Sequence, residues 1–148
     1  MEDNDLSGLI EKNMGLVTKV ISDLKLSNSN EKDEFRQIGR IALWESFILC
    51  RSSKWKFSTI AYRKIMWAII AYLRLSRIRK EHDSLSIQRG KTEGLVEYLP
   101  KMTDAEDEFV SYCIDGYSIK EIASKYNKST TWAYTQYRQI IKKIQHAQ

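Results

Sequence analysis

The chain has 148 residues, of which 43% are hydrophobic and 29% charged, and its formal net charge is +5. This length suits one domain or two small ones, and the composition is typical of a globular rather than a disordered protein. No apolar run approaches the roughly 20 residues that a membrane span needs, and the acidic start Met1–Asp5 is unlike a secretory signal.

Two amphipathic helices are predicted at the start of the chain. Residues 4–25 carry an apolar stripe with steps of three and four, and a polar break follows at 26–30. A second helix is predicted at about 31–50. Its apolar face comprises Phe35, Ile38, Ala42 and Phe47, widened by Ile41, Leu43, Trp44 and Ile48. Because one side of this helix is nevertheless polar near its start, we expect it to contact both its own core and a partner.

Residues 55–74 predict one long helix around which the rest of the chain is organised. Ser58 or Thr59 is the expected N-cap, since a hydroxyl accepts a hydrogen bond from an amide of the first turn. The predicted inner face repeats at helical spacing and comprises Ala61, Ile65, Ala68, Ile69, Tyr72 and Leu73. Three cations lie off this face, namely Arg63, Lys64 and Arg74. We expect the helix to continue through Lys80.

Positive charge is concentrated in the middle of the chain. Residues 51–91 hold eleven Lys and Arg against two acids, whereas the parts on either side are slightly acidic. Trp55, Tyr62 and Trp67 lie among these cations. Single-stranded nucleic acid is bound by cations that contact its phosphates and by aromatic rings that stack on its bases. The pattern therefore favours a nucleic-acid surface; the alternative is a solvated basic helix with its aromatic rings in the core.

Residues 82–103 are predicted to link two units. The segment is polar and contains two glycines and the chain's only proline, Pro100. A short ordered piece is expected within it, around Leu95, Val96 and Leu99.

Three short helices are predicted in residues 104–148. Asp104 is the expected cap of the first, with Asp107 three residues later. Ser118 and Glu121 predict a capping box at the start of the second helix, about 119–126.

A tight turn at Asn127–Lys128 and a cap at Ser129 are predicted before the third helix. Helix, tight turn and helix is the arrangement of the helix-turn-helix motif, whose second helix enters the major groove by its N-terminal residues. The residues expected to contact duplex DNA are Ser129, Thr130, Thr131, Trp132, Thr135, Gln136, Arg138 and Lys142. A plain three-helix bundle is the alternative.

Several of these segments resemble the sigma-70 family of bacterial RNA polymerase sigma factors. Leu9–Val17 resembles the opening helix of the family's core region, and Glu34–Trp44 resembles the helix that docks on the coiled coil of the polymerase clamp. Lys56–Ala61 resembles the motif before the helix that opens the minus-ten element. Residues 104–148 resemble the domain that binds the minus-thirty-five element and the polymerase flap. Residues 82–103 stand where larger members of the family have a middle domain, which is similar to the small alternative sigmas and to sigma-like proteins of phages and mobile elements.

The resemblance implies an all-α fold and a role in directing bacterial RNA polymerase to specific promoters and assisting DNA opening. The implied domains are a sigma core of three to four helices at 1–81, a linker at 82–103 and a small helix-turn-helix domain at 104–148. Polymerase binding is implied for Glu34, Gln37, Ile38, Arg40 and Trp44. Minus-ten DNA binding is implied for Trp55, Lys56, Arg63, Lys64, Trp67 and Arg74.

Four positions depart from the family pattern. Ile60 stands where the family has an aromatic residue, and Ile38 replaces an acid. Arg63 and Lys64 replace the aromatic pair with which housekeeping members capture a flipped adenine and wedge the duplex. Trp67 or Tyr62 is the candidate substitute for those rings.

A second hypothesis is a helix-turn-helix DNA-binding regulator without a polymerase role, whose front half serves dimerisation or inhibitor binding. Gln37 and Trp44 on one helix face favour the sigma interpretation. We expect no enzyme activity, cofactor or metal, because the sequence has no phosphate-binding glycine loop, no nucleophile–base arrangement and no metal-ligand spacing. The isolated Cys50 and Cys113 favour reduced thiols and a cytoplasmic protein, and the sigma interpretation implies that it is nucleoid-associated. Expected partners are the polymerase core and promoter DNA, with an anti-sigma factor or coactivator as a further one, and no membrane.

Overall fold

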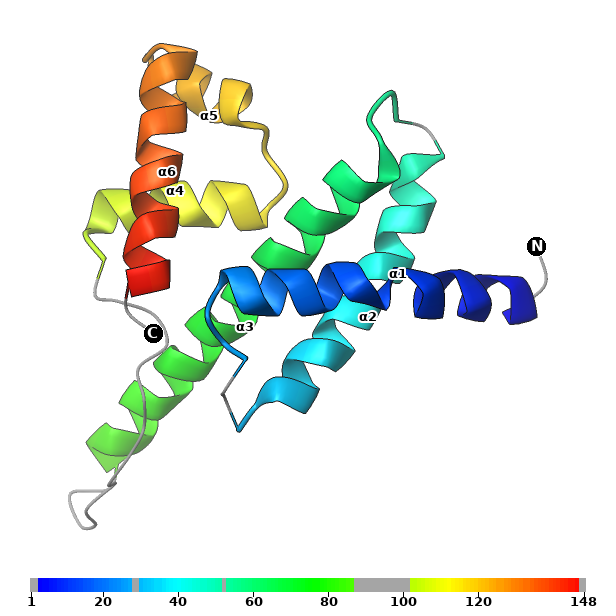
Figure 1. Cartoon of the computed structure of the whole chain (residues 1–148). Coiled ribbons are helices and arrows are strands. Elements are labelled where there is room, and N and C mark those ends of the chain that lie inside the picture. The colour runs from blue at the N-terminus through cyan, green and yellow to red at the C-terminus, as the bar shows by residue number, and fades with distance from the viewer. Residues whose placement is uncertain (1–2, 28–29, 52, 87–101, 147–148) are drawn as a thin grey trace. The chain divides into compact units, whose positions relative to one another are not determined.

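The computed structural model is all-helical (Figure 1): the residues that it describes, 3–27, 30–51, 53–86 and 102–146, form six helices and no strand. The helices are α1 (Asp3–Asp23), α2 (Lys32–Cys50), α3 (Phe57–Ser86), α4 (Asp104–Ile114), α5 (Ile119–Lys125) and α6 (Thr130–His146). The all-α prediction is therefore confirmed. None of the described helices is long and apolar enough to cross a membrane.

The chain divides into two compact units, Met1–Ile70 and Ala71–Gln148, and the division falls within α3. Residues 82–86, expected in the linker, continue α3 as helix. Residues 87–101, with the ordered piece expected around Leu95, Val96 and Leu99, lie outside the described part. The predicted domain bounds stay a prediction.

In the first unit, α1 lies across α2 (Figure 1), and their close approach is at Val17 and Gly39. The side chains of the core come from all three helices of the unit. They include Val17, Val20, Ile21, Leu24, Phe35, Leu43, Ala61, Ile65 and Ile69. The hydroxyl of Tyr62 on α3 donates a 2.5 Å hydrogen bond to Asp23 Oδ2 near the end of α1. Phe47 of α2 stacks on Phe57 of α3 with 4.3 Å between ring centroids.

The chain turns at the end of α1 through a residue with positive φ, Lys25 at 57°. The amide of Leu26 donates to Ile21 O and that of Lys25 to Ser22 O, each at 2.9 Å, the bond pattern of a Schellman motif. Leu26 is buried, although a polar break was expected to begin there. The Leu26 side chain is part of the core of the first unit, just after the end of α1.

Helix α3 begins at Phe57, one or two residues before the expected cap. The carbonyl of Lys56 accepts hydrogen bonds from the amides of Thr59 and Ile60, so Ser58 and Thr59 lie inside the first turn and the predicted cap is wrong. Four residues of the predicted inner face are buried, namely Ala61, Ile65, Ile69 and Leu73. Ala68 and Tyr72 are only half-buried, while Met66, Trp67 and Ile70 are buried as well.

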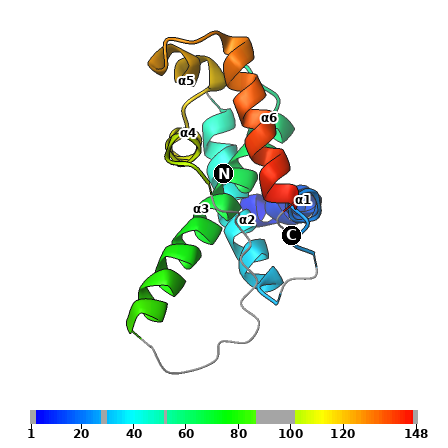
Figure 2. The ribbon, with the colours of Figure 1, turned by 90° about the vertical axis from the view of Figure 1, so that its left-hand side faces the viewer.

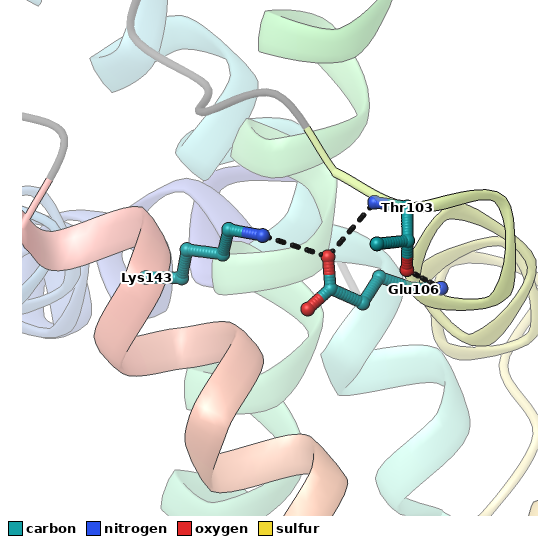
Figure 3. Close-up of polar contacts among 3 residues, drawn as sticks. All are labelled: Thr103, Glu106 and Lys143. Atoms are coloured by element: carbon teal, nitrogen blue, oxygen red, sulfur yellow. Dashed lines mark hydrogen bonds and ion pairs between the residues drawn. The ribbon is translucent and has the colours of Figure 1, made fainter.

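In the second unit, α4 runs across α6 (Figures 1 and 2). The N-cap of α4 is Thr103, not Asp104: its Oγ1 accepts from the Glu106 amide at 3.3 Å, and Glu106 Oε2 accepts from the Thr103 amide at 2.9 Å. The same carboxylate oxygen also lies 2.9 Å from Lys143 Nζ of α6 (Figure 3). The capping box at the start of α4 is therefore joined to α6 through the contact between Glu106 and Lys143.

The capping box at the start of α5 and the turn after that helix follow the prediction. Gly116 has φ 94°, and the Tyr117 amide donates to Tyr112 O. Ser118 and Glu121 form the predicted capping box of α5. Asn127, at φ 52°, ends that helix, since the Lys128 amide donates to Ala123 O at 3.0 Å. The second unit buries Phe109, Val110, Cys113, Ile119, Ile122, Ala123, Ala133, Ile140 and Ile144.

Candidate functional site

Helix α2 presents two apolar faces on opposite sides. The inner one packs into the first unit and carries Phe35, Gly39, Ala42, Leu43 and Ser46. The opposite one, here called the outer α2 face, carries Glu34, Gln37, Ile41, Trp44 and Ile48 at steps of three and four. Ile41, Trp44 and Ile48 are 53%, 44% and 51% exposed. Exposed apolar side chains that share one stripe are typical of an interaction surface.

The residues implied for polymerase binding do not all lie on this face. Glu34, Gln37 and Trp44 are exposed there. Arg40 lies at its edge, where its guanidinium pairs with Glu11 of α1 at 2.6 Å. Ile38 is half-buried. Helical spacing therefore places three of the five together on the outer α2 face.

A second exposed group lies at the entry to α3. Trp55, in the segment before the helix, is 71% exposed, and its amide donates to Ser53 Oγ at 3.1 Å. Lys56 and Arg63 are exposed as well. An exposed indole with two exposed cations in the same stretch is suited to a single strand, which needs both stacking and charge.

Two further cations of the predicted minus-ten set already have partners within the chain. Lys64 Nζ lies 2.8 Å from Glu45 Oε2 of α2. Arg74 Nη1 donates to Ser111 Oγ of α4 at 2.7 Å. A phosphate that bound either cation would compete with these contacts.

Trp67 differs from the expectation of a stacking residue. It is only 6% exposed and lies in the core beside Met66 and Ile70, which are also buried. This part of α3 is apolar around most of its circumference. The spacing of its apolar residues therefore cannot show which side of the helix is buried. Tyr62, the other candidate substitute, is half-buried and bonded to Asp23. In this structure Trp55 is the ring of that region that offers a stacking surface.

The start of α6 presents most of the residues predicted for duplex DNA. Ser129 Oγ caps the helix by accepting from the Trp132 amide at 3.1 Å, as predicted. Thr130, Thr131, Thr135, Arg138 and Lys142 are exposed, and Thr135 Oγ1 donates to Thr131 O at 2.9 Å within the helix. Gln136 is half-buried. This surface is polar with a cationic end.

Trp132 faces an aromatic cluster rather than open solvent. Its ring lies 5.3 Å from that of Tyr126, which in turn contacts the rings of Phe109 and Tyr112. The Tyr126 hydroxyl donates to Glu108 Oε2 at 2.9 Å. Burial, followed by this carboxylate, raises the pKa of Tyr126 to about 12. The cluster joins α4, α5 and the start of α6 and so holds the turn between the last two helices.

Four residues of these surfaces were missed as site residues. Ile41 and Ile48 lie on the outer α2 face, and their spacing from Gln37 and Trp44 was the available signal. Tyr134 is 48% exposed and follows Thr131 by three residues on α6. Glu45 had no signal in the sequence, because its contact with Lys64 joins two helices.

The described residues contain no group of His, Cys, Asp and Glu side chains that could hold a metal ion. Comparison of the chain with protein-family models, with curated proteins and with solved structures found no match in any of the three.

Proposed function

We propose that this chain is a promoter-specificity subunit of bacterial RNA polymerase, similar to a small sigma factor. The observation that carries the proposal is the two-faced α2, whose outer face holds Gln37 and Trp44 in solvent while its inner face fills the core. A helix that only built a fold would need no exposed tryptophan and isoleucines in register.

In this proposal the outer α2 face binds the polymerase. Trp55, Lys56 and Arg63 bind the separated strand of the minus-ten element. Opening a duplex loses about 1.4 kcal/mol of stacking per base step, and stacking a base on a protein ring returns roughly 1–3 kcal/mol. One exposed indole can therefore decide whether a strand stays open. Trp55 takes this role instead of Trp67 or Tyr62.

The start of α6 binds upstream duplex in the same proposal. Thr131 and Thr135 are exposed where a helix-turn-helix places base contacts, and Arg138 and Lys142 lie one and two turns further on for phosphates. In this proposal the first compact unit binds polymerase and the opened strand, and the second binds upstream duplex.

The test is capture of bacterial core polymerase by the purified chain. We expect the wild type to bind and the Gln37→Ala/Trp44→Ala variant to fail. Lys19→Ala, an exposed change on α1, is the matched control and should bind like the wild type.

The competing hypothesis, a DNA-binding regulator without a polymerase role, is supported by the capped helices of the second unit, which need no polymerase to bind duplex. It predicts that the chain binds duplex DNA but captures no core polymerase. If the wild type captures no core polymerase but still binds duplex DNA, the regulator hypothesis replaces the first proposal.

A further inference from the structure

The outer α2 face is part of a longer stripe of exposed residues whose two ends carry opposite charges. Glu34, Gln37, Ile41, Trp44, Ile48 and Arg51 follow one another at alternating steps of three and four, and all six are exposed. Arg51, the C-cap residue, keeps helical dihedral angles at φ −59° and ψ −30°, so the stripe extends to it. This is the spacing of a coiled-coil seam.

The two ends of the stripe carry opposite charges. Glu34 lies in the first turn of α2, whereas Arg51 lies at its C-terminal end and Lys54 just beyond. Asp33, beside Glu34 but off the stripe, pairs with Arg36 at 3.9 Å. The apolar centre consists of Ile41, Trp44 and Ile48. A stripe with one acidic end, an apolar centre and one basic end is complementary to itself when turned end over end.

We propose that the outer α2 face pairs with the same face of a second copy of this chain in an antiparallel, two-fold arrangement. A two-fold contact is isologous: where one residue meets another, the second meets the first in return. The register that this stripe allows places Ile41 against Trp44 of the second copy, Gln37 against Ile48, and Glu34 against Arg51. Every pair is apolar or oppositely charged except that of Gln37, whose amide lies beside an isoleucine.

A parallel pairing of the same stripe is disfavoured by charge. It would place Glu34 beside Glu34 and Arg51 beside Arg51, two like-charge contacts at the ends of the seam. The antiparallel direction is therefore the one that the charges select.

The pairing is weak and depends on concentration. One face of a single helix falls short of the roughly 800 Å² per partner that stable complexes bury. Charge pairs at its ends are screened by salt, so the dimer forms best at low ionic strength.

The dimer also has a consequence for the proposed function. Since both partners use the outer α2 face, the dimer and the polymerase complex exclude each other. This consequence depends on the proposed function, whereas the dimer itself does not. Sedimentation of the purified chain alone therefore tests the dimer even if the polymerase proposal fails.

The experiment is sedimentation velocity of the full chain over a dilution series at low salt, with Glu34→Arg and Arg51→Glu variants. We expect the wild type to shift from monomer to dimer as its concentration rises. Each reversal places like charges at both ends of the seam, and we expect each to weaken self-association by about tenfold. An equimolar mixture of the two variants restores both charge pairs, so it should dimerise at least as well as the wild type.

Two further variants separate this interface from other causes. Trp44→Ala removes the largest side chain of the apolar centre and should abolish the dimer. Lys19→Glu, a charge reversal on the exposed surface of α1, should leave it unchanged. Circular dichroism checks that each variant is folded. A wild type that stays monomeric overturns the proposal, and so does a dimer that survives both reversals. If the reversals act but their mixture stays monomeric, the antiparallel register is wrong.

Discussion

A Cβ atom added at Gly39 of α2 would lie 2.8 Å from Cγ2 of Val17 on α1 and closer still to its Cγ1. Both residues are buried, and a β-branched valine cannot swing out of a packed core. This pair therefore sets how closely α1 and α2 approach.

We expect Gly39→Ala to destabilise the first unit by about 1–3 kcal/mol, the usual effect of overpacking a core. Thermal unfolding followed by circular dichroism measures the change. Gly15→Ala on α1 is the matched control: a Cβ there meets nothing within 4 Å. Since alanine favours a helix over glycine by about 1 kcal/mol, the control should be stabilised. Equal effects of the same sign at both sites would contradict this account of Gly39.

Acid should destabilise the second unit through its capping boxes. The hydrogen bond from Lys143, followed by that from the Thr103 amide, lowers the pKa of Glu106, and the Ser118 amide lowers that of Glu121. Because both pKa values are lowered by folding, the ionised carboxylates stabilise the fold above the ordinary value of 4.5. That stabilisation is lost as the pH falls through the folded-state pKa values.

The melting temperature of the wild type should thus fall more steeply below pH 4.5 than that of Glu106→Gln. Lys143→Gln removes the largest cause of the lowered pKa and should flatten the slope in part. Parallel curves for the wild type and Glu106→Gln would show that this carboxylate does not contribute.

Alkali should act through Tyr126. Its pKa is raised to about 12 from the ordinary 10.0 by burial and by Glu108, so the protonated phenol stabilises the fold fully below pH 10. The stabilisation is lost as the pH rises from 10 towards 12. An ultraviolet titration of the eight tyrosines should show one late phase, absent in Tyr126→Phe and shifted to lower pH in Glu108→Gln. A late phase that persists in Tyr126→Phe would assign it to another tyrosine.

The ion pair between Glu45 and Lys64 should compete with phosphate. At 2.8 Å the carboxylate neutralises the ammonium, so Lys64→Gln alone should hardly change the affinity for a single-stranded oligonucleotide. Glu45→Gln frees Lys64; it should raise the affinity and steepen its logarithmic dependence on salt by about 0.7. In the Glu45→Gln variant, a further Lys64→Gln substitution should return the affinity to the wild-type value.

Arg63, the exposed neighbour of Lys64, is the control for this pair of substitutions at Glu45 and Lys64. Arg63→Gln should lower the affinity for the same oligonucleotide by the same factor whether residue 45 is Glu or Gln. An unchanged affinity in Glu45→Gln would mean that Lys64 does not bind the strand.

The local signals of the second unit predicted its structure closely. The capping box of Ser118 and Glu121 and the turn at Asn127 depend on residues within one or two turns of each other. The start of α4 was misplaced by one residue because Thr103, Asp104, Glu106 and Asp107 offer two competing caps with the same spacing. The choice of Thr103 is supported by Lys143, which lies 37 residues away and so left no local signal.

Tertiary packing decided the features that the sequence did not predict. Trp67 is buried together with Met66 and Ile70, so the buried part of α3 is wider than its predicted stripe, and hydrophobic periodicity cannot show how wide a face will be covered. Lys25 adopts positive φ although lysine has no preference for it, since the burial of Leu26 directs the chain. On α2, residue spacing correctly placed Glu34, Gln37 and Trp44 on one face. The expectation that Ile41, Trp44 and Ile48 widen the apolar face of Phe35 was wrong, because they lie on the opposite side of the helix and are exposed.

The dissociation constant of the chain for bacterial core polymerase, measured beside that of the Gln37→Ala/Trp44→Ala variant, tests the central claim most directly. Exposed tryptophans at interfaces often contribute about 2 kcal/mol or more. We therefore predict saturable binding by the wild type, at least about tenfold weaker binding by the double variant, and no change in Lys19→Ala. Equal affinities for the wild type and the double variant, or no binding of the wild type, would contradict the assignment of the outer α2 face to polymerase.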